Sequence, residues 1–259
     1  MSSRPPQRSL RHEYELYVEE EIEKYKESLP RSALLSIGDE AATILAADPQ
    51  IGLTELLLCD EVDRIIRKRL RLSSYRTWRR RHLKLLAELR RPEHWGLQSD
   101  DAVVSAVRAG IDSRVLVAGA ADGRSALYLA AQGCEVTTID TAQDVLERVL
   151  DAAYQCGLGG RVHAQIADLA SWSPAAPLSA VVCEPAALAD LTIEQRAHAI
   201  DVLQRATATG GVHLLHTATA GHPTRIPIDE LRGRYDGWEV SIESFRGAPE
   251  TLLARKSVS

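Results

Sequence analysis

The sequence predicts an α/β protein with a small all-α bundle in its N-terminal part. Two observations support this prediction. Residues 10–91 place apolar side chains at three- and four-residue spacing and contain no convincing strand, whereas residues 100–257 alternate short apolar runs with helix-like stretches. Such alternation is typical of a doubly wound, mostly parallel sheet. We therefore expect a helical domain over residues 1–95 and a sheet domain over residues 96–259.

Four amphipathic helices are expected in the first half. Their apolar stripes are interrupted by prolines, which remove a backbone donor, and by serines that can cap a following helix. The expected segments are residues 10–29, 32–47, 53–70 and 74–90, with Ser32 and either Ser73 or Ser74 as caps and with Pro30, Asp48-Pro49 and Pro92 as breaks. Short loops between four such helices indicate a small bundle.

Seven strands are expected in the second half. They are residues 114–118, 135–140, 162–169, 180–183, 212–217, 238–245 and 251–256, and helices are expected at 123–132, 142–156, 193–207 and 227–235. The last two strands are separated only by residues 246–250, so they should form an antiparallel hairpin. The prediction is thus a seven-stranded sheet, mostly parallel, with an antiparallel hairpin at its C-terminal end.

Composition narrows the class of protein. Hydrophobic residues make up 45% and charged residues 26%, as in folded soluble chains. No apolar run is long enough for a membrane span, and the N-terminus lacks a secretion signal, so we expect a cytoplasmic protein with no membrane contact. The four cysteines form no CxxC pair, and no metal site is expected. The net charge of −5 argues against a generic polyanion binder.

The segment from Val115 to Asp140 contains the pattern that predicts a ligand-binding site. A strand runs into a turn of small residues that opens a helix, and the free amides of a helix start favour a ligand that touches the backbone. The next strand ends at Asp140, whose carboxylate can accept hydrogen bonds from ribose hydroxyls. This arrangement predicts a nucleoside-containing ligand at the strand ends. Read alone, Asp140 is equally compatible with a helix cap.

The residues of this turn can be compared with two glycine motifs that bind nucleoside cofactors. The dinucleotide spacing GxGxxG would fall on Gly119, Ala121 and Arg124, where arginine would prevent close packing of helix on strand. The alternative spacing GxGxG falls on Gly119, Ala121 and Gly123. A nicotinamide or flavin cofactor is therefore disfavoured.

With this spacing, residues from about 99 to 257 resemble class I S-adenosylmethionine-dependent methyltransferases, and among them the tellurite-resistance (TehB-like) group. The stretches that carry the resemblance are DGRSALYLAAQGCEVTTID, DELRGRYDGWEV and the closing TLLARK. The resemblance implies a Rossmann-like methyltransferase fold, S-adenosyl-L-methionine as cofactor, and a small molecule or chalcogen oxyanion as methyl acceptor.

The same resemblance implies roles for individual residues. Gly119, Ala120, Ala121 and Gly123 would hold the methionine part of the cofactor. Asp140 and Thr141 would hold the ribose, and Asp168 and Leu169 would contact the adenine. Glu184, directly after the fourth strand, is the candidate for a catalytic base or for substrate orientation. A solvated loop acid is the alternative interpretation of Glu184.

Three positions depart from the family pattern. Val117 stands where the family carries an acid that positions the cofactor's ammonium group, Ala121 replaces the middle glycine, and Ala120 replaces a cysteine. Loss of one charge-assisted hydrogen bond costs about 1.5–3 kcal/mol. A second hypothesis follows, in which the chain keeps the fold but acts as a non-catalytic scaffold or binding subunit.

A basic stretch in the helical half raises further hypotheses. Arg64–Arg91 contains twelve of the 31 lysines and arginines, with Tyr75 and Trp78 among them. Such a surface can bind nucleic acid. The interpretation we favour is that these cations pair with the seven glutamates of residues 13–27. A docking surface for a protein partner or for a second copy of the chain is the third possibility.

Overall fold

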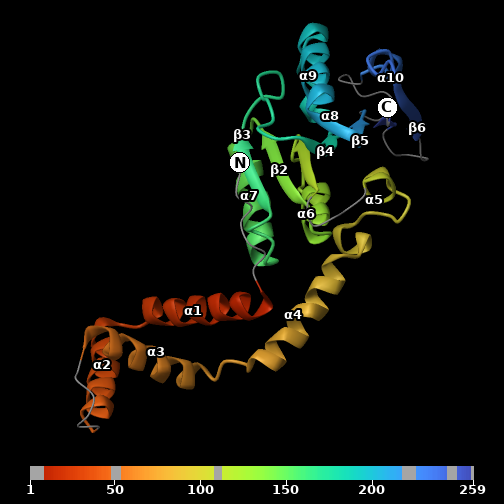
Figure 1. The fold of residues 1–259 in the computed structure, drawn as a ribbon. Helices are drawn as coiled ribbons and strands as arrows, with labels where there is room; N and C mark the ends of the chain where they lie inside the picture. The colour runs from red at the N-terminus through yellow and green to blue at the C-terminus, as the bar shows by residue number, and fades with distance from the viewer. Residues whose placement is uncertain (1–8, 48–53, 108–112, 218–225, 244–249, 258–259) are drawn as a thin grey trace. The chain divides into compact units, whose positions relative to one another are not determined.

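The computed structural model describes residues 9–47, 54–107, 113–217, 226–243 and 250–257 (Figure 1). The chain divides into two compact units, Met1–Leu85 and Leu86–Ser259. Each unit is described by itself below. Leu86 and Leu89, near the end of one helix, pack into the core of the second unit, so the last turn of that helix belongs with the sheet.

The first unit is built from helices, as predicted. They are α1 (Leu10–Ser28), α2 (Arg31–Ala46), α3 (Glu55–Leu70) and the first turns of α4 (Tyr75–Leu89). The cap of α2 is Pro30 and not Ser32, because Pro30 holds the extended conformation from which the helix starts. Ser74 caps α4, since its Oγ accepts the Thr77 N–H at 3.4 Å. The expected break at Asp48-Pro49 lies outside the described residues.

Aromatic side chains form part of the core of the helical unit. Tyr14 is buried, and its ring centroid lies 5.5 Å from that of Tyr75 and 5.4 Å from that of Trp78. Trp78 stacks on His82 with centroids 4.5 Å apart. The Tyr14 hydroxyl donates to the Ser73 carbonyl at 2.8 Å. Tyr75 and Trp78 are partly buried and pack against this core, so their rings already have partners within the unit.

The ion pairs of the described residues do not support the favoured explanation for the basic stretch. Arg64 pairs with Glu61 in its own helix, Arg69 pairs with Glu40 of α2, and Arg91 pairs with Glu88 at 3.2 Å. Two of these pairs are between residues three positions apart, where helix geometry brings side chains together without any second helix. The glutamates of α1 pair instead with Lys24, Lys26 and Arg11, and with His82 of α4.

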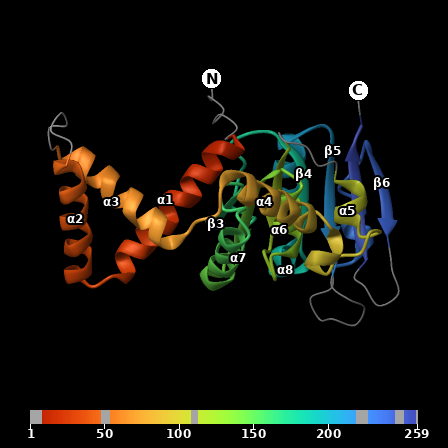
Figure 2. The ribbon, with the colours of Figure 1, turned by 90° about the horizontal axis from the view of Figure 1, so that it is seen from below.

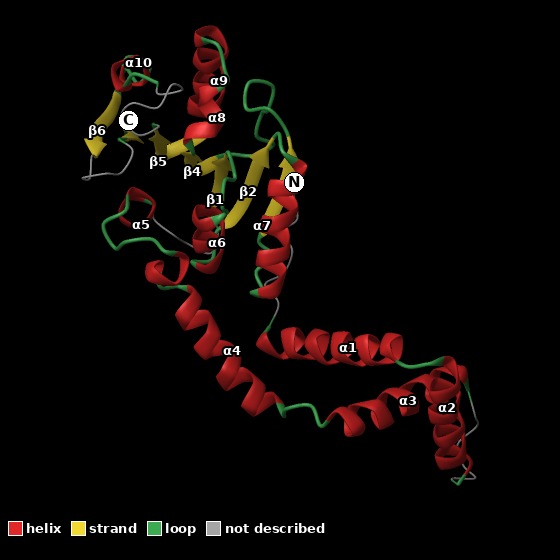
Figure 3. Ribbon diagram, turned by 180° about the vertical axis from the view of Figure 1, so that it is seen from behind, coloured by secondary structure: helices red, strands yellow, loops and turns green. Residues whose placement is uncertain are grey.

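The second unit is a seven-stranded sheet covered by helices on both faces (Figure 3). Its strands are β1 (Arg114–Ala118), β2 (Glu135–Asp140), β3 (Val162–Ile166), β4 (Leu178–Cys183), β5 (Thr207–His216), β6 (Trp238–Glu243) and β7 (Thr251–Lys256). Its helices are η1 (Pro92–Trp95), α5 (Ala102–Ala106), α6 (Arg124–Ala131), α7 (Gln143–Gln155), α8 (Pro185–Ala189), α9 (Ile193–Ala206) and α10 (Ile228–Arg232).

The strand order is β3-β2-β1-β4-β5-β7-β6. Neighbouring strands from β3 to β5 run parallel, whereas β7 runs antiparallel to both β5 and β6. This confirms the predicted mostly parallel sheet and its antiparallel hairpin. Because β1 lies beside both β2 and β4, the order reverses between β1 and β4, and such a reversal opens a crevice at the carboxyl edge of the sheet.

Several element bounds differ from the prediction. β3 ends at Ile166 and not at Leu169, since Ala167 is the last residue whose N–H follows the β2 ladder, to the Asp140 carbonyl. β5 begins at Thr207, directly after α9, so Gly210 and Gly211 lie inside the strand rather than before it. The short helices η1, α5 and α8 were not predicted, because four or five residues show too little periodicity.

Two apolar cores lie on opposite faces of the sheet. Alternate residues of β1 show this, since Val115 and Val117 join α5, α6 and α7 on one face, while Leu116 and Ala118 join α8, α9 and α10 on the other. Figure 1 shows α9 and α10 on one side of the strands and α6 and α7 on the other. Figure 2 shows the same sheet from below, with β3 and β6 at its two edges. The sheet is thus buried on both faces, as parallel strands require.

A buried polar chain crosses the second core. His213 is fully buried, with its Nε2 2.7 Å from Thr207 Oγ1 and its Nδ1 2.7 Å from the Tyr235 hydroxyl. Burial, with a smaller effect of the Lys256 charge, lowers the pKa of His213 to about 3. His216 Nδ1 lies 2.8 Å from Thr251 Oγ1. Both histidines are hydrogen-bonded parts of the fold.

Two negative findings apply to the part of the chain that the structure describes. None of its helices combines the length and apolar character needed to cross a bilayer. No group of three or more histidine, cysteine, aspartate or glutamate side chains there could hold a metal ion.

Candidate functional site

A cavity of about 190 Å³ lies at the carboxyl edge of the sheet, where the strand order reverses. Its floor is made by the ends of β1, β2 and β3, and its wall by α8 and the start of α9. The lining residues are Ala118, Gly119, Ile139, Asp140, Thr141, Ala167, Asp168, Leu169, Ala186, Ala187, Asp190, Leu191 and Gln195. Five of these thirteen are alanine or glycine, which leaves a slot between backbone surfaces that suits a flat ring.

The turn between β1 and α6 depends on two glycines. Gly119 has a φ of +75°, and a Cβ there would lie 3.0 Å from the Ala187 backbone nitrogen. Gly123 has a φ of +76°, and a Cβ there would lie 2.8 Å from Val149 Cγ2 of α7. Gly119 therefore allows α8 to approach the turn, whereas Gly123 allows α7 to pack beneath it.

Ala121 occupies a glycine-like position in the same turn. Its φ is +47°, in the left-handed region that costs an L-residue about 1–2 kcal/mol. Ala121 is exposed, so its methyl group fills no part of the core. This is a conformation that glycine adopts without a steric cost.

Asp140 connects the end of β2 to the glycine turn. Its Oδ2 accepts the Ala120 N–H and its Oδ1 accepts the Ala142 N–H, both at 2.9 Å. Asp140 is not the cap of α7, because the residue at that position is Ala142, which makes no side-chain cap bond. A carboxylate offers about four lone-pair sites, so each oxygen keeps capacity for a ligand hydroxyl.

Asp168 and Leu169 follow β3 and line the cavity. Asp168 Oδ1 accepts the Ala170 N–H at 2.9 Å, and the aspartate is exposed. Leu169 is buried with only 4% of its surface accessible. Together they present a carboxylate edge beside an apolar surface, a combination that suits a base bearing an amino group.

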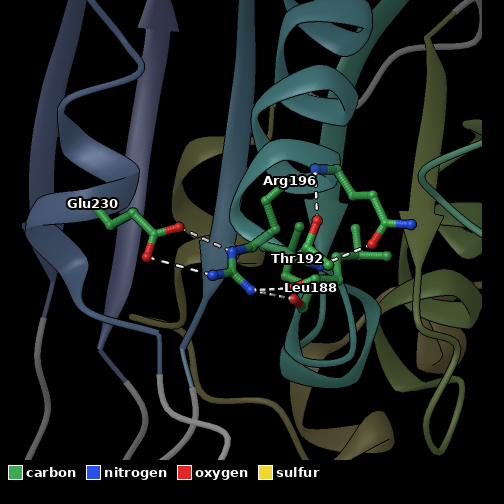
Figure 4. A network of polar contacts seen from close by, with 6 residues as sticks. Leu188, Thr192, Arg196 and Glu230 are labelled. Atoms are coloured by element: carbon green, nitrogen blue, oxygen red, sulfur yellow. Dashed lines mark hydrogen bonds and ion pairs between the residues drawn. The ribbon is translucent and has the colours of Figure 1, made fainter.

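The cavity wall is held by Arg196 of α9 (Figure 4). Its Nη1 donates to the Leu188 carbonyl at 3.3 Å and to the Leu191 carbonyl at 2.5 Å, and its Nε donates to Glu230 of α10 at 3.0 Å. Thr192 and Gln195 form a capping box that starts α9. Arg196 therefore ties the loop that carries Asp190 and Leu191 to α10.

Glu184 lies between the sheet and the glycine turn. Its N–H donates to the Ala118 carbonyl at 2.9 Å, and its Oε1 accepts the Ser125 hydroxyl of α6 at 2.9 Å. Its Cβ lies 3.4 Å from the position that a Gly119 Cβ would take. Burial, together with the nearby Glu184 carboxylate, raises the pKa of the Cys183 thiol to about 12.

The structure brings together five of the nine residues that the sequence proposed for the site. Gly119, Asp140, Thr141, Asp168 and Leu169 all line the cavity. The other four, Ala120, Ala121, Gly123 and Glu184, border the turn without lining the cavity as it stands. The wall residues Asp190, Leu191 and Gln195 were missed. The sequence Thr192-Ile-Glu-Gln195 is a capping-box signature that marks the start of α9, and it could have directed attention to this loop.

The strand order and the cavity at the switch point define a class I methyltransferase fold. A model of the family "Tellurite resistance protein TehB" matches residues 96–243, more than half of the chain. The chain therefore belongs to the TehB family. Comparison of the sequence with curated proteins gives no match.

Solved structures of similar fold are distant in sequence. TehB from Haemophilus influenzae is 21% identical, with a TM-score of 0.49, and the match covers 61% of this chain and 60% of that protein. A TehB-like SAM-dependent methyltransferase from Corynebacterium glutamicum is 15% identical, with a TM-score of 0.49, covering 71% of this chain and 97% of the other. The [4+2]-cyclase SpnF is 19% identical, with a TM-score of 0.50, covering 61% and 80%.

Proposed function

We propose that the protein is an S-adenosylmethionine-dependent methyltransferase that acts on a small molecule in the cytoplasm. The observation that carries this proposal is the cavity at the β1–β4 switch point, with Asp140 and Asp168 in its lining. Family membership and the resemblance of the glycine turn point to the same cofactor.

The residues present fit the nucleoside part of that cofactor. Asp140 has acceptor capacity left for ribose hydroxyls, with Thr141 beside it, and Asp168 can accept from an exocyclic amine. The cavity is smaller than the roughly 300–1,000 Å³ of sites that enclose drug-sized ligands. It therefore suits a nucleoside, and the amino-acid tail would extend beyond Gly119.

The chemical demand on the protein is small. The bound cofactor would supply an activated methyl group on sulfur. The contribution of this chain is to fix the nucleoside through Asp140 and Asp168 and to keep the wall in place through Arg196. Glu184 would act as a base only for an acceptor that must lose a proton.

A non-catalytic scaffold is the second candidate function. Val117 is buried in the core with 1% of its surface accessible, so β1 offers no charge to the ligand at that position. The fold itself is compatible with other activities, because one of the structures that share it is named a [4+2]-cyclase. Ligand binding without methyl transfer would support this alternative.

Isothermal titration calorimetry with S-adenosylhomocysteine tests the proposal. The expected result is saturable binding that Asp140→Ala abolishes, while Asp236→Ala, an exposed acid on the turn before β6, leaves it unchanged. Mass spectrometry of the natively purified protein would show whether a nucleoside accompanies it. Absence of heat at millimolar ligand, together with no bound nucleoside, would contradict the proposal.

A further inference from the structure

We propose that Glu184 recognises the positive charge of an adenosyl ligand's amino-acid tail, supplying from β4 the acid that β1 lacks. This inference rests on the proposed function and concerns the part of the ligand that the cavity does not enclose. It assigns to Glu184 a binding role, in place of the base or substrate-orienting role that its position in the sequence suggested.

The first support is position. Gly119 lines the cavity, and the Glu184 Cβ lies 3.4 Å from where a Gly119 Cβ would be. A tail attached to a ribose held by Asp140 leaves the cavity along the glycine turn that begins at this glycine. Glu184 is half-buried, so its carboxylate is partly shielded from solvent and can still be reached by a ligand.

The second support is orientation. The Ser125 hydroxyl donates to Glu184 Oε1 at 2.9 Å, which draws the carboxylate toward the start of α6. Within the described residues, no hydrogen bond is recorded to Oε2. One oxygen therefore fixes the side chain while the other remains able to accept from a ligand ammonium group.

The third support is charge. Val117 is apolar and buried, and the acid nearest to it in the turn, Asp122, is exposed and paired with Arg124 at 2.5 Å. Among the described residues that line the cavity, none is a lysine or an arginine. A cationic group entering along the turn would therefore meet Glu184 as its counter-charge, without a competing cation in the cavity lining.

The test compares two ligands that share adenosine and sulfur but differ in the tail. S-adenosylhomocysteine carries an ammonium group, whereas 5′-methylthioadenosine ends in a neutral methyl group. Glu184→Gln keeps the size of the side chain and an oxygen that can accept from Ser125, so the fold should persist, and a melting curve checks this. Glu194→Gln, an exposed acid in the first turn of α9, is the matched control because it removes the same charge near the same wall.

We expect Glu184→Gln to weaken S-adenosylhomocysteine binding about tenfold, the lower end for a charge-assisted bond, and to leave 5′-methylthioadenosine affinity within twofold. Glu194→Gln should change neither. The role of Glu184 would be overturned if the variant lost affinity equally for both ligands or lost it for neither. It would also be overturned if the wild-type protein bound 5′-methylthioadenosine but not S-adenosylhomocysteine. Each of these outcomes would leave the nucleoside site intact. Failure of the wild-type protein to bind either ligand would overturn the proposed function itself.

Discussion

Acid should destabilise the sheet unit through one histidine. His213 is fully buried between Thr207 and Tyr235, with Trp238 4.8 Å away by ring centroids, and its folded-state pKa of about 3 lies below the value of about 6.5 expected in the unfolded chain. The unfolded state therefore binds more protons between these two pH values. The contribution of neutral His213 to stability is complete above pH 6.5 and is lost as pH falls toward 3.

The magnitude can be worked out for a change from pH 7.5 to 4.5. At pH 4.5 the folded histidine is still neutral, so the loss depends on how far the pH lies below the unfolded pKa. Two pH units at 1.36 kcal/mol each give about 2.7 kcal/mol of lost unfolding free energy from this group alone. The result hardly depends on the folded pKa, provided that it stays below 4.5.

Urea denaturation of the full chain, followed by circular dichroism at several pH values, measures this loss. His213→Gln retains donor and acceptor groups but has no proton to gain, so its unfolding free energy should fall less with acid than that of the wild type, by about 2–3 kcal/mol. Carboxylates elsewhere titrate equally in both proteins and cancel in the difference. Parallel pH dependences for the two proteins would refute the assignment.

Three further predictions concern the glycine turn, the cavity wall and the basic helix. Ala121→Gly removes the left-handed strain and should raise the free energy of unfolding by up to about 1 kcal/mol, measured by denaturation; a loss of stability would contradict the strain argument. Arg196→Met leaves two carbonyls and a half-buried glutamate unpaired and should cost about 2–4 kcal/mol, together with weaker nucleoside binding in calorimetry; an unchanged midpoint would show that the wall stands without it. Replacing Arg79, Arg80 and Arg81 by glutamate should lower the salt needed to elute the protein from a polyanion column if α4 binds nucleic acid, and an unchanged elution would remove that hypothesis.

Periodicity and strand–helix alternation were enough to predict the fold. β1, β2 and β7 have the predicted bounds, since each contains apolar or β-branched residues that favour a strand. β5 was harder, since Gly210 and Gly211 read as a break, while the structure places them within the strand. The ladder to β4 pairs Thr207 and then resumes at Val212 with a shift of register, so the two glycines lie in an irregular stretch between paired residues.

The candidate site was predicted only in part. Residues at strand ends, such as Asp140 and Asp168, follow from topology, because parallel strands bring their carboxyl ends to one edge. The wall formed by residues 186–195 could not be predicted in this way, since it depends on Arg196 reaching carbonyls five and eight residues back along the chain. The partners of the basic stretch were not predicted either, because Arg64 and Arg91 pair with glutamates three residues away along the chain and only Arg69 pairs across to another helix.

The left-handed backbone at Ala121 has a consequence for how this protein could change. Every alanine codon becomes a glycine codon by replacement of its second base, so one nucleotide separates Ala121 from glycine, and the backbone there already lies in the left-handed region that glycine adopts without strain. Valine codons are likewise one base from an aspartate or glutamate codon, which would restore an acid at Val117. Random mutagenesis under selection for tighter cofactor binding would reach both reversions without passing through a rearranged loop.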